Sequence, residues 1–105
     1  MRIITTGDAP VGRNKNGVVA RKLYSRPDGE AVHISIEPGR TLPTHITPVD
    51  VFMYVLEGNG EVEVGEEREK VEQGMLVESP MNIPHALYNT GEGPFRVLVI
   101  KMPKP

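Results

Sequence analysis

The chain has no cysteine and no tryptophan, and it lacks any long hydrophobic run. The absence of cysteine excludes disulfide bridges and metal sites built on thiolates. No apolar stretch approaches the roughly 20 residues that a transmembrane helix needs. Residues 1–10 also lack the apolar core of a signal peptide. The sequence therefore predicts a cytoplasmic protein with no membrane partner.

An excess of charge of one sign is also missing. Twelve Lys and Arg residues stand against 14 Asp and Glu residues, for a formal net charge of −2. Proteins that bind nucleic acid through the phosphate backbone need a basic run or a stripe of basic and aromatic residues. The sequence contains neither, so we expect no nucleic-acid partner.

Turn-forming residues are abundant, with eleven glycines and ten prolines in 105 residues. They leave no stretch of a dozen residues with helical periodicity that is free of both. Period-two alternation or continuous apolar character predicts strands at residues 18–24, 31–37, 51–56, 61–64, 75–78, 85–88 and 95–101. A chain of this length builds one core of useful size. We therefore predict one all-β domain over residues 1–105, either a two-sheet sandwich or a barrel.

Three turn signals connect the predicted strands. Arg-Pro-Asp-Gly at residues 26–29 suits a tight turn, because proline presets φ and glycine accepts positive φ. Gly-Asn-Gly at residues 58–60 predicts a hairpin link, and Val-Gly-Glu at residues 64–66 predicts a second tight reversal.

The most specific pattern lies in residues 39–58 and 74–89, where glycines, prolines and histidines recur at defined spacings. The two stretches resemble the two motifs of the cupin superfamily. The sequence Tyr-Val-Leu-Glu-Gly at residues 54–58 is also common in members of this family. The matching positions are Gly39, His45 and Gly58 in the first motif and Gly74, Pro80, His85 and Asn89 in the second. The resemblance implies a double-stranded antiparallel β-helix, also called a jelly-roll barrel. It says little about function, because a fold hosts many activities.

The departures from the family pattern concern metal binding. Family members with a metal use His, His and Glu from the first motif and His from the second. In this sequence Thr47 occupies the position of the second histidine, and Val51 occupies the position of the glutamate. Asp50 is one residue out of register, which sends its side chain to the opposite strand face unless a bulge intervenes. The resemblance therefore implies only His45 and His85 as ligands of a divalent Zn, Fe, Ni or Mn ion, and we expect weak or absent metal.

The strand parity predicts a binding pocket inside the barrel. Alternate residues share a face, so the pocket should be lined by His45, Thr47, Val51, Met53, His85 and Leu87. We expect a small organic ligand there, since barrel mouths with mostly apolar walls and a few polar groups are frequent ligand sites. Two alternatives stay open for His33. It could supply a third nitrogen ligand to a metal ion, or it could lie on the outer face of its strand.

Three functions fit this pocket. A small-molecule-binding barrel is favoured over a metal-dependent enzyme, such as a dioxygenase or isomerase acting on a small organic acid or sugar, because the metal ligands are depleted. A purely structural subunit is disfavoured, because burying two histidines in a pocket without hydrogen-bond partners costs free energy. Whether the protein is an enzyme stays open at this level.

Two predicted strands are apolar on both faces. Their outer rows comprise Phe52, Tyr54 and Leu56 on one strand and Leu98 and Ile100 on the other. An exposed apolar patch of that size is rare on a soluble monomer. The amino-terminal segment or a partner subunit should cover these rows, and a homodimer is predicted.

Overall fold

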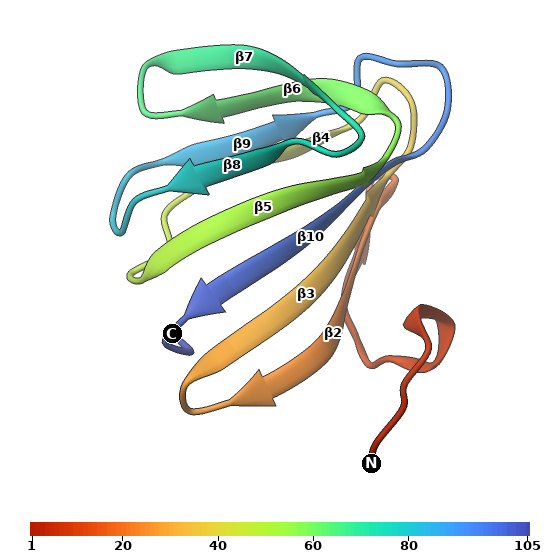
Figure 1. Ribbon diagram of the computed structural model, residues 1–105. Coiled ribbons are helices and arrows are strands. Elements are labelled where there is room, and N and C mark those ends of the chain that lie inside the picture. The colour runs from red at the N-terminus through yellow and green to blue at the C-terminus, as the bar shows by residue number, and fades with distance from the viewer.

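In the computed structural model, which describes residues 1–105, ten strands form two antiparallel sheets that face each other (Figure 1). The first sheet has the order β1 (Val11–Lys15), β2 (Val18–Arg26), β3 (Gly29–Ile36), β10 (Phe95–Met102), β5 (Asp50–Glu57) and β8 (Leu76–Ser79). The second has the order β4 (Thr41–His45), β9 (His85–Tyr88), β6 (Asn59–Val64) and β7 (Glu67–Glu72). The predicted all-β jelly-roll architecture is confirmed.

The hydrophobic core lies between the sheets, and strand alternation places its side chains there. On β10, Phe95, Val97 and Val99 are buried and point inward, while the residues between them are only partly buried on the outer face. They pack against inward residues of β3 and β5, its hydrogen-bonded neighbours. The only helical segment is a three-residue turn, η1 (Thr6–Asp8), and no helix is long or apolar enough to cross a membrane.

All seven predicted strands are present, with ends displaced by at most two residues. Three further strands, β1, β4 and β7, lie outside the prediction. Each is at the edge of its sheet or carries polar residues at most positions. In β7 only Val71 is buried and the other five residues are exposed. Such a segment lacks the alternation that predicts a strand, because backbone pairing with β6 rather than burial holds it.

The hairpin expected at residues 58–60 is wrong. Strand β5 belongs to the first sheet and β6 to the second, so the chain crosses between sheets at this point. Gly58 has φ of +83°, and a Cβ there would collide with the Pro94 carbonyl. The glycines therefore allow a corner with close backbone approach rather than a hairpin. The other two turns join β2 to β3 and β6 to β7 as predicted.

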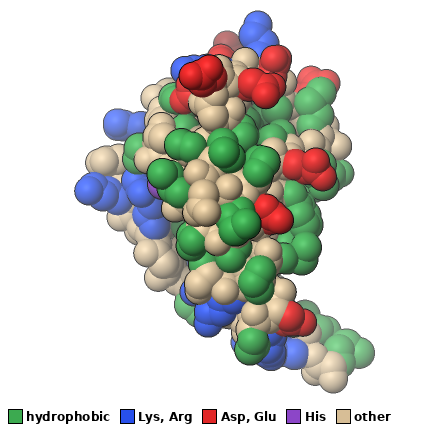
Figure 2. Space-filling model, turned by 90° about the vertical axis from the view of Figure 1, so that its left-hand side faces the viewer, with side chains coloured by type: hydrophobic (Ala, Val, Ile, Leu, Met, Phe, Trp, Pro, Cys, Tyr) green, Lys and Arg blue, Asp and Glu red, His purple; other side chains and the backbone are tan.

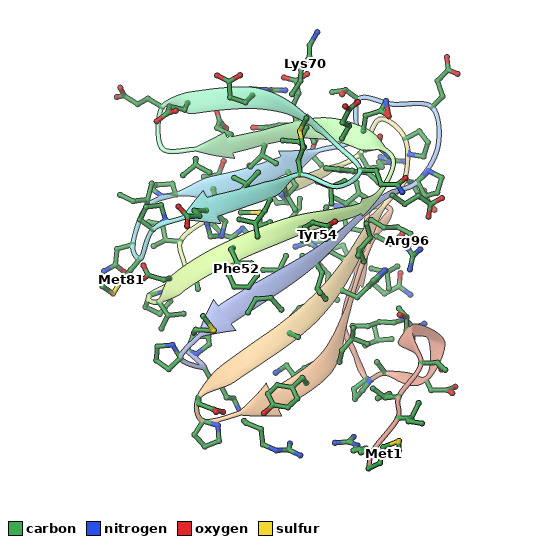
Figure 3. The ribbon with its side chains drawn as sticks, in the orientation of Figure 1. Met1, Phe52, Tyr54, Lys70, Met81 and Arg96 are labelled. Atoms are coloured by element: carbon green, nitrogen blue, oxygen red, sulfur yellow. The ribbon has the colours of Figure 1, made fainter.

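The outer face of the first sheet remains partly open. Tyr54 is 39% exposed and Leu76 is 53% exposed, while Phe52, Leu98 and Ile100 are partly buried beside them. The amino-terminal segment is held near β2, where the Arg21 guanidinium donates to the carbonyls of Gly7 and Ala9. Met1 lies far from Phe52 and Tyr54 (Figure 3). Within one chain, the amino-terminal segment does not cover the outer row of β5.

Candidate functional site

The two motif histidines meet at one end of the barrel. His45 is the last residue of β4 and His85 is the first of β9, and the two are paired across the strands. Their Nε2 atoms are 2.9 Å apart, and the rings are nearly perpendicular, with centroids 4.3 Å apart. The pairing of β4 with β9 therefore brings together two residues that are 40 positions apart in the sequence.

Neighbouring groups determine which ring nitrogens carry protons. His45 Nδ1 lies 3.1 Å from the Pro43 carbonyl, which only accepts, so this nitrogen is the donor. With its proton on Nδ1, His45 accepts at Nε2, and His85 donates to it from its own Nε2. His85 Nδ1 in turn accepts from the Ser79 hydroxyl at 2.8 Å. The result is a directed chain of hydrogen bonds from Ser79 through His85 to His45.

His85 is held in its neutral form. The residue is 4% exposed. Burial, followed by the neighbouring His45 ring and the Lys101 ammonium group, lowers the pKa of His85 to about 4. A neutral imidazole at neutral pH is the form that both donates and accepts hydrogen bonds. His85 therefore acts in this site through hydrogen bonds rather than as a charged imidazolium.

A small cavity lies beside the histidine pair. Its volume is about 40 Å³, and it is lined by Val32, Ile34, Leu42, His45, Met53, His85, Leu87, Val99 and Lys101. We call this space the histidine cavity. A cavity needs roughly 10–15 Å³ of such space to admit one water molecule, so this one admits a small group such as a short alkyl chain.

Four of the six residues predicted to line the pocket border this cavity, namely His45, Met53, His85 and Leu87. Thr47 is buried and does not border it, although its Oγ1 lies 3.4 Å from His85 Nε2. Val51 is also buried, but it borders a neighbouring hollow with Asp50 and Ser79. Thr47 and Val51 therefore lie near the histidines but do not line the histidine cavity.

Lys101 and Glu30 belong to this end of the barrel and were missed by sequence reasoning. Lys101 borders the histidine cavity, and its Nζ lies 3.8 Å from the Glu30 carboxylate. Glu30 is 5% exposed and has a second ion pair with Lys22 at 3.3 Å. The parity of β10 was the available signal, because Lys101 continues the inward row of Phe95, Val97 and Val99. Ser79 was also missed, and its signal was its parity with Val77 on β8.

The donor set does not fit a tightly held catalytic metal ion. The two Nε2 atoms converge, but no group of three or more His, Asp or Glu residues is close enough to hold an ion. Asp50 is exposed, and its Oδ1 accepts from the Met81 amide at 2.9 Å. No bulge re-aims it, since it pairs regularly with Met102. The Lys101 ammonium group also places positive charge beside the site, which disfavours a cation.

His33 does not supply a third ligand. It lies on β3 opposite Arg21 and Leu98, on the outer face of the sheet. Its Nε2 accepts from the Arg96 Nε at 3.0 Å, and the residue is 4% exposed. Burial and the charge of Arg96 lower the pKa of His33. Of the two alternatives, the outer-face position is correct, but the ring is covered rather than solvated.

A second and larger hollow lies between the free edges of the two sheets. It has a volume of about 630 Å³ and is bordered by β7 and β8. Its apolar floor includes Val62, Val64, Val77 and Ile83, and its rim carries Glu66, Glu67, Glu69 and Glu78. We call it the acidic groove. None of these four carboxylates has an ion-pair partner, since the salt bridges of the chain involve only Glu30, Glu57 and Glu61.

Apolar side chains gather around the histidine end of the barrel. Figure 2 views the left-hand side of Figure 1, where hydrophobic side chains occupy much of the centre. Ile46 is exposed between β4 and β5, Met81 (labelled in Figure 3) and Ile83 are exposed between β8 and β9, and Met102 is exposed at the end of β10. A ligand that protrudes from the histidine cavity would therefore meet an apolar surface.

The chain was compared with known proteins. Residues 32–101 match the family model described as "Cupin domain". No curated protein matches the chain. A conserved protein of unknown function from Streptococcus pyogenes, SPY1581, is 26% identical with a TM-score of 0.75, and the match covers 88% of this chain and 79% of that one.

Other solved structures share the fold at lower identity. KdgF from Halomonas is 20% identical with a TM-score of 0.88, over 100% of this chain and 96% of that one. A predicted oxalate decarboxylase from Thermotoga maritima is 16% identical with a TM-score of 0.86, over 98% and 100%. These similar folds carry different names, so the fold alone does not assign an activity. The family match spans both histidines and the strands that position them, and the chain belongs to the cupin domain family.

Proposed function

We propose that the protein binds a small organic carboxylate at the histidine end of the barrel. The ligand's short apolar group enters the histidine cavity, and its carboxylate lies beside Lys101. The lining of the cavity carries this proposal: six hydrophobic side chains, two imidazoles and one ammonium group, with no carboxylate among them. Such a wall suits an apolar group with one negative charge.

The charge balance around Lys101 supports an anion. Glu30 is the nearest carboxylate to Lys101, and it is shared with Lys22. Two ammonium groups on one buried carboxylate leave a net positive charge within this group of three side chains. A carboxylate accepts several hydrogen bonds, and bonds to charged donors are about twice as strong as neutral ones. The ammonium group of Lys101 is the available donor, because both imidazole N–H groups of the histidine pair already donate, to the Pro43 carbonyl and to His45 Nε2.

A pair of isosteric probes tests the proposal. Propionate and propionamide share an ethyl group that matches the cavity but differ in charge. We expect propionate to bind with a dissociation constant of about 1 mM by NMR titration, and propionamide to bind at least about tenfold more weakly. Binding of neither probe would overturn the proposed function. Equal binding of both would retain a pocket but overturn the assignment to carboxylates.

Lys101→Met should weaken propionate binding roughly tenfold or more, because it removes a charged donor. Lys22→Met is the matched control, since Lys22 also pairs with Glu30 but does not border the cavity. It should leave the affinity within about twofold. If both variants weaken binding equally, the carboxylate is not held by Lys101.

A metal-dependent enzyme, such as a dioxygenase or isomerase of a small organic acid or sugar, is the second candidate. The observation that favours it is the convergence of the two Nε2 atoms at 2.9 Å. Elemental analysis of the purified protein distinguishes the candidates. Near-stoichiometric zinc, iron, nickel or manganese that is lost in His45→Ala would place the enzyme first.

We also propose that the protein forms a homodimer through the outer face of the first sheet. The support is the exposure of Tyr54 and Leu76 beside the partly buried Phe52, Leu98 and Ile100. Light scattering at micromolar concentration should give twice the monomer mass. Leu98→Glu should shift the protein to monomer, whereas Thr44→Glu, on the edge strand β4 of the other sheet, should not. A wild-type monomer would contradict this proposal.

A further inference from the structure

The acidic groove is closed at both ends by backbone hydrogen bonds. At one end the chain turns from β7 into β8 (Figure 1), and the Gly74 amide donates to the Val55 carbonyl at 3.0 Å. At the other end the Gly65 amide donates to the Pro84 carbonyl at 2.8 Å, which ties the β6–β7 turn to the β8–β9 loop. The volume of about 630 Å³ is in the range of small-molecule pockets. A hollow bounded in this way suits a small molecule better than a polypeptide that has to pass through it.

The floor of the groove is apolar and is not covered by the chain itself. Strand β6 contributes Val64, and β8 contributes Val77, and both side chains are partly exposed. Ile83, from the β8–β9 loop, is 37% exposed, and its Cγ2 would lie 3.4 Å from a Cβ at Gly65. The side chain of Ile83 therefore lies against the closed end of the groove. A ligand with an apolar body would bury this floor, which favours binding.

The rim of the groove is acidic, and no basic side chain lines it. Glu67 and Glu69 share the inward face of β7, and Glu78 lies on β8 at the other wall. Inward charge on an edge strand discourages pairing with other chains, but that role requires no apolar floor beside it. The combination of an apolar floor with carboxylates on both walls is complementary to a molecule with an apolar body and more than one positive charge.

The basic side chain between the two inward glutamates is held on the other face of β7. The Arg68 Nε donates to the Glu61 carboxylate at 2.9 Å, and its guanidinium carbon lies 3.7 Å from the centroid of the Tyr88 ring. Both partners lie outside the groove. Arg68 is therefore engaged elsewhere and does not neutralise the rim, so the cation that the groove fits comes from a ligand.

We propose that the acidic groove binds an aliphatic diamine or polyamine. The methylene chain covers the apolar floor, and the ammonium groups pair with Glu67 and Glu69 on one wall and with Glu78 on the other. Hydrogen bonds between two charged groups are about twice as strong as neutral ones, and burial of the chain adds a hydrophobic contribution. The groove is separate from the histidine cavity, so this proposal does not depend on the proposed carboxylate ligand.

Three probes separate the requirement for charge from the requirement for an apolar chain. 1,8-Diaminooctane has both, octane-1,8-diol has the chain without the charges, and 1,3-diaminopropane has the charges on a short chain. We expect 1,8-diaminooctane to bind with a dissociation constant below about 1 mM by titration calorimetry, and each of the others at least about tenfold more weakly. Absence of 1,8-diaminooctane binding would overturn the proposal. Equal affinity for either comparator would overturn it too, because the groove would then not recognise both features.

Paired substitutions test whether the rim carboxylates hold the ligand. Glu67→Gln combined with Glu69→Gln should weaken 1,8-diaminooctane binding about tenfold or more. Glu72→Gln combined with Glu92→Gln is the matched control, since it removes the same charge from exposed positions outside the groove. The control should keep the affinity within about twofold. Equal losses in both double variants would show a general attraction of cations to an acidic protein, and the proposal would fail.

Methyl NMR spectra locate the bound diamine. Addition of 1,8-diaminooctane should shift the methyl signals of Val64, Val77 and Ile83, which line the groove, and leave those of Val32 and Leu42 of the histidine cavity in place. Shifts centred on the histidine cavity would overturn the assignment to the groove. The double variant at positions 67 and 69 should retain its affinity for propionate, so that failure of this proposal and failure of the proposed function are distinguishable.

Discussion

The histidine cavity and the acidic groove both lie between the two sheets, yet they differ in almost every property. The cavity has a volume of about 40 Å³ and is lined by inward residues of central strands such as β3 and β10, whereas the groove has about 630 Å³ and is bordered by the edge strands β7 and β8. Central strands carry apolar inward rows that meet across the core. The edge strand β7 instead carries Glu67 and Glu69 beside the groove, where the central strands carry apolar residues.

The comparison distinguishes two kinds of surface on one small barrel. At the cavity, a few polar groups are set in a packed apolar wall, which suits a small ligand with defined chemistry. At the groove, apolar floor and unpaired charge are spread over a longer surface, which suits a larger ligand of opposite charge. Substitutions in matched pairs, one at each region, sharpen or break this contrast.

The largest difference should appear in the cost of truncating an apolar side chain. Leu87 is 2% exposed and borders the cavity, so Leu87→Ala should lower the free energy of unfolding by about 2–5 kcal/mol. Ile83 is 37% exposed on the groove floor, and Ile83→Ala should cost less than about 1 kcal/mol in the monomer. Urea denaturation measures both. Equal losses would show that the groove is as well packed as the cavity.

The cavity should also make stability depend on pH. Unfolded His85 has its ordinary pKa of 6.5, and folded His85 has a pKa of about 4. Between these values only the unfolded chain binds the proton. The contribution is therefore complete above pH 6.5 and is lost as the pH falls towards 4, by at most about 3 kcal/mol.

His85→Gln should flatten this pH dependence, because it removes the titrating group. His33 has a lowered pKa too and adds a change of the same sign, so His33→Gln is the necessary comparison. Glu67→Gln, in the groove, removes a carboxylate rather than a histidine and should leave the slope between pH 6.5 and 4 largely in place. An unchanged slope in His85→Gln would contradict the neutral, buried state of this ring.

A smaller difference in stability cost is expected between substitutions at Ser79 and at its neighbour on β8, Glu78. Ser79 is 1% exposed and donates to His85 Nδ1, so Ser79→Ala should cost about 1–3 kcal/mol by leaving a buried acceptor unpaired. Glu78 is exposed at the groove rim, and Glu78→Ala should change stability by less than about 0.5 kcal/mol. Thermal denaturation of the two variants compares them. A neutral Ser79→Ala would mean that Ser79 does not fix the His85 tautomer.

Much of the fold follows from local sequence. Alternation identified the strands that form the core, because a buried row of valine, isoleucine and leucine repeats every second residue. The same rule failed for β7, whose residues are charged on both faces. It also misread residues 58–60, since the requirement for glycine there comes from the approach of Pro94, which is 36 positions away. Strand pairing and chain crossing are long-range, and local pattern does not report them.

The sequence by itself determined the cupin fold, the presence of His45 and His85 and the depletion of metal ligands, because spacing and parity are local properties. Only the tertiary structure decided which groups surround the histidines. Lys101, Glu30 and Ser79 reach that end of the barrel on three different strands, and the sheet register, not their spacing, brings them together. The opposite charges of residues 1–26 and residues 57–78 were also present in the sequence. The strand order placed the basic segment at the β1–β2 edge of the first sheet and most of the acidic segment on β6 and β7 of the second sheet.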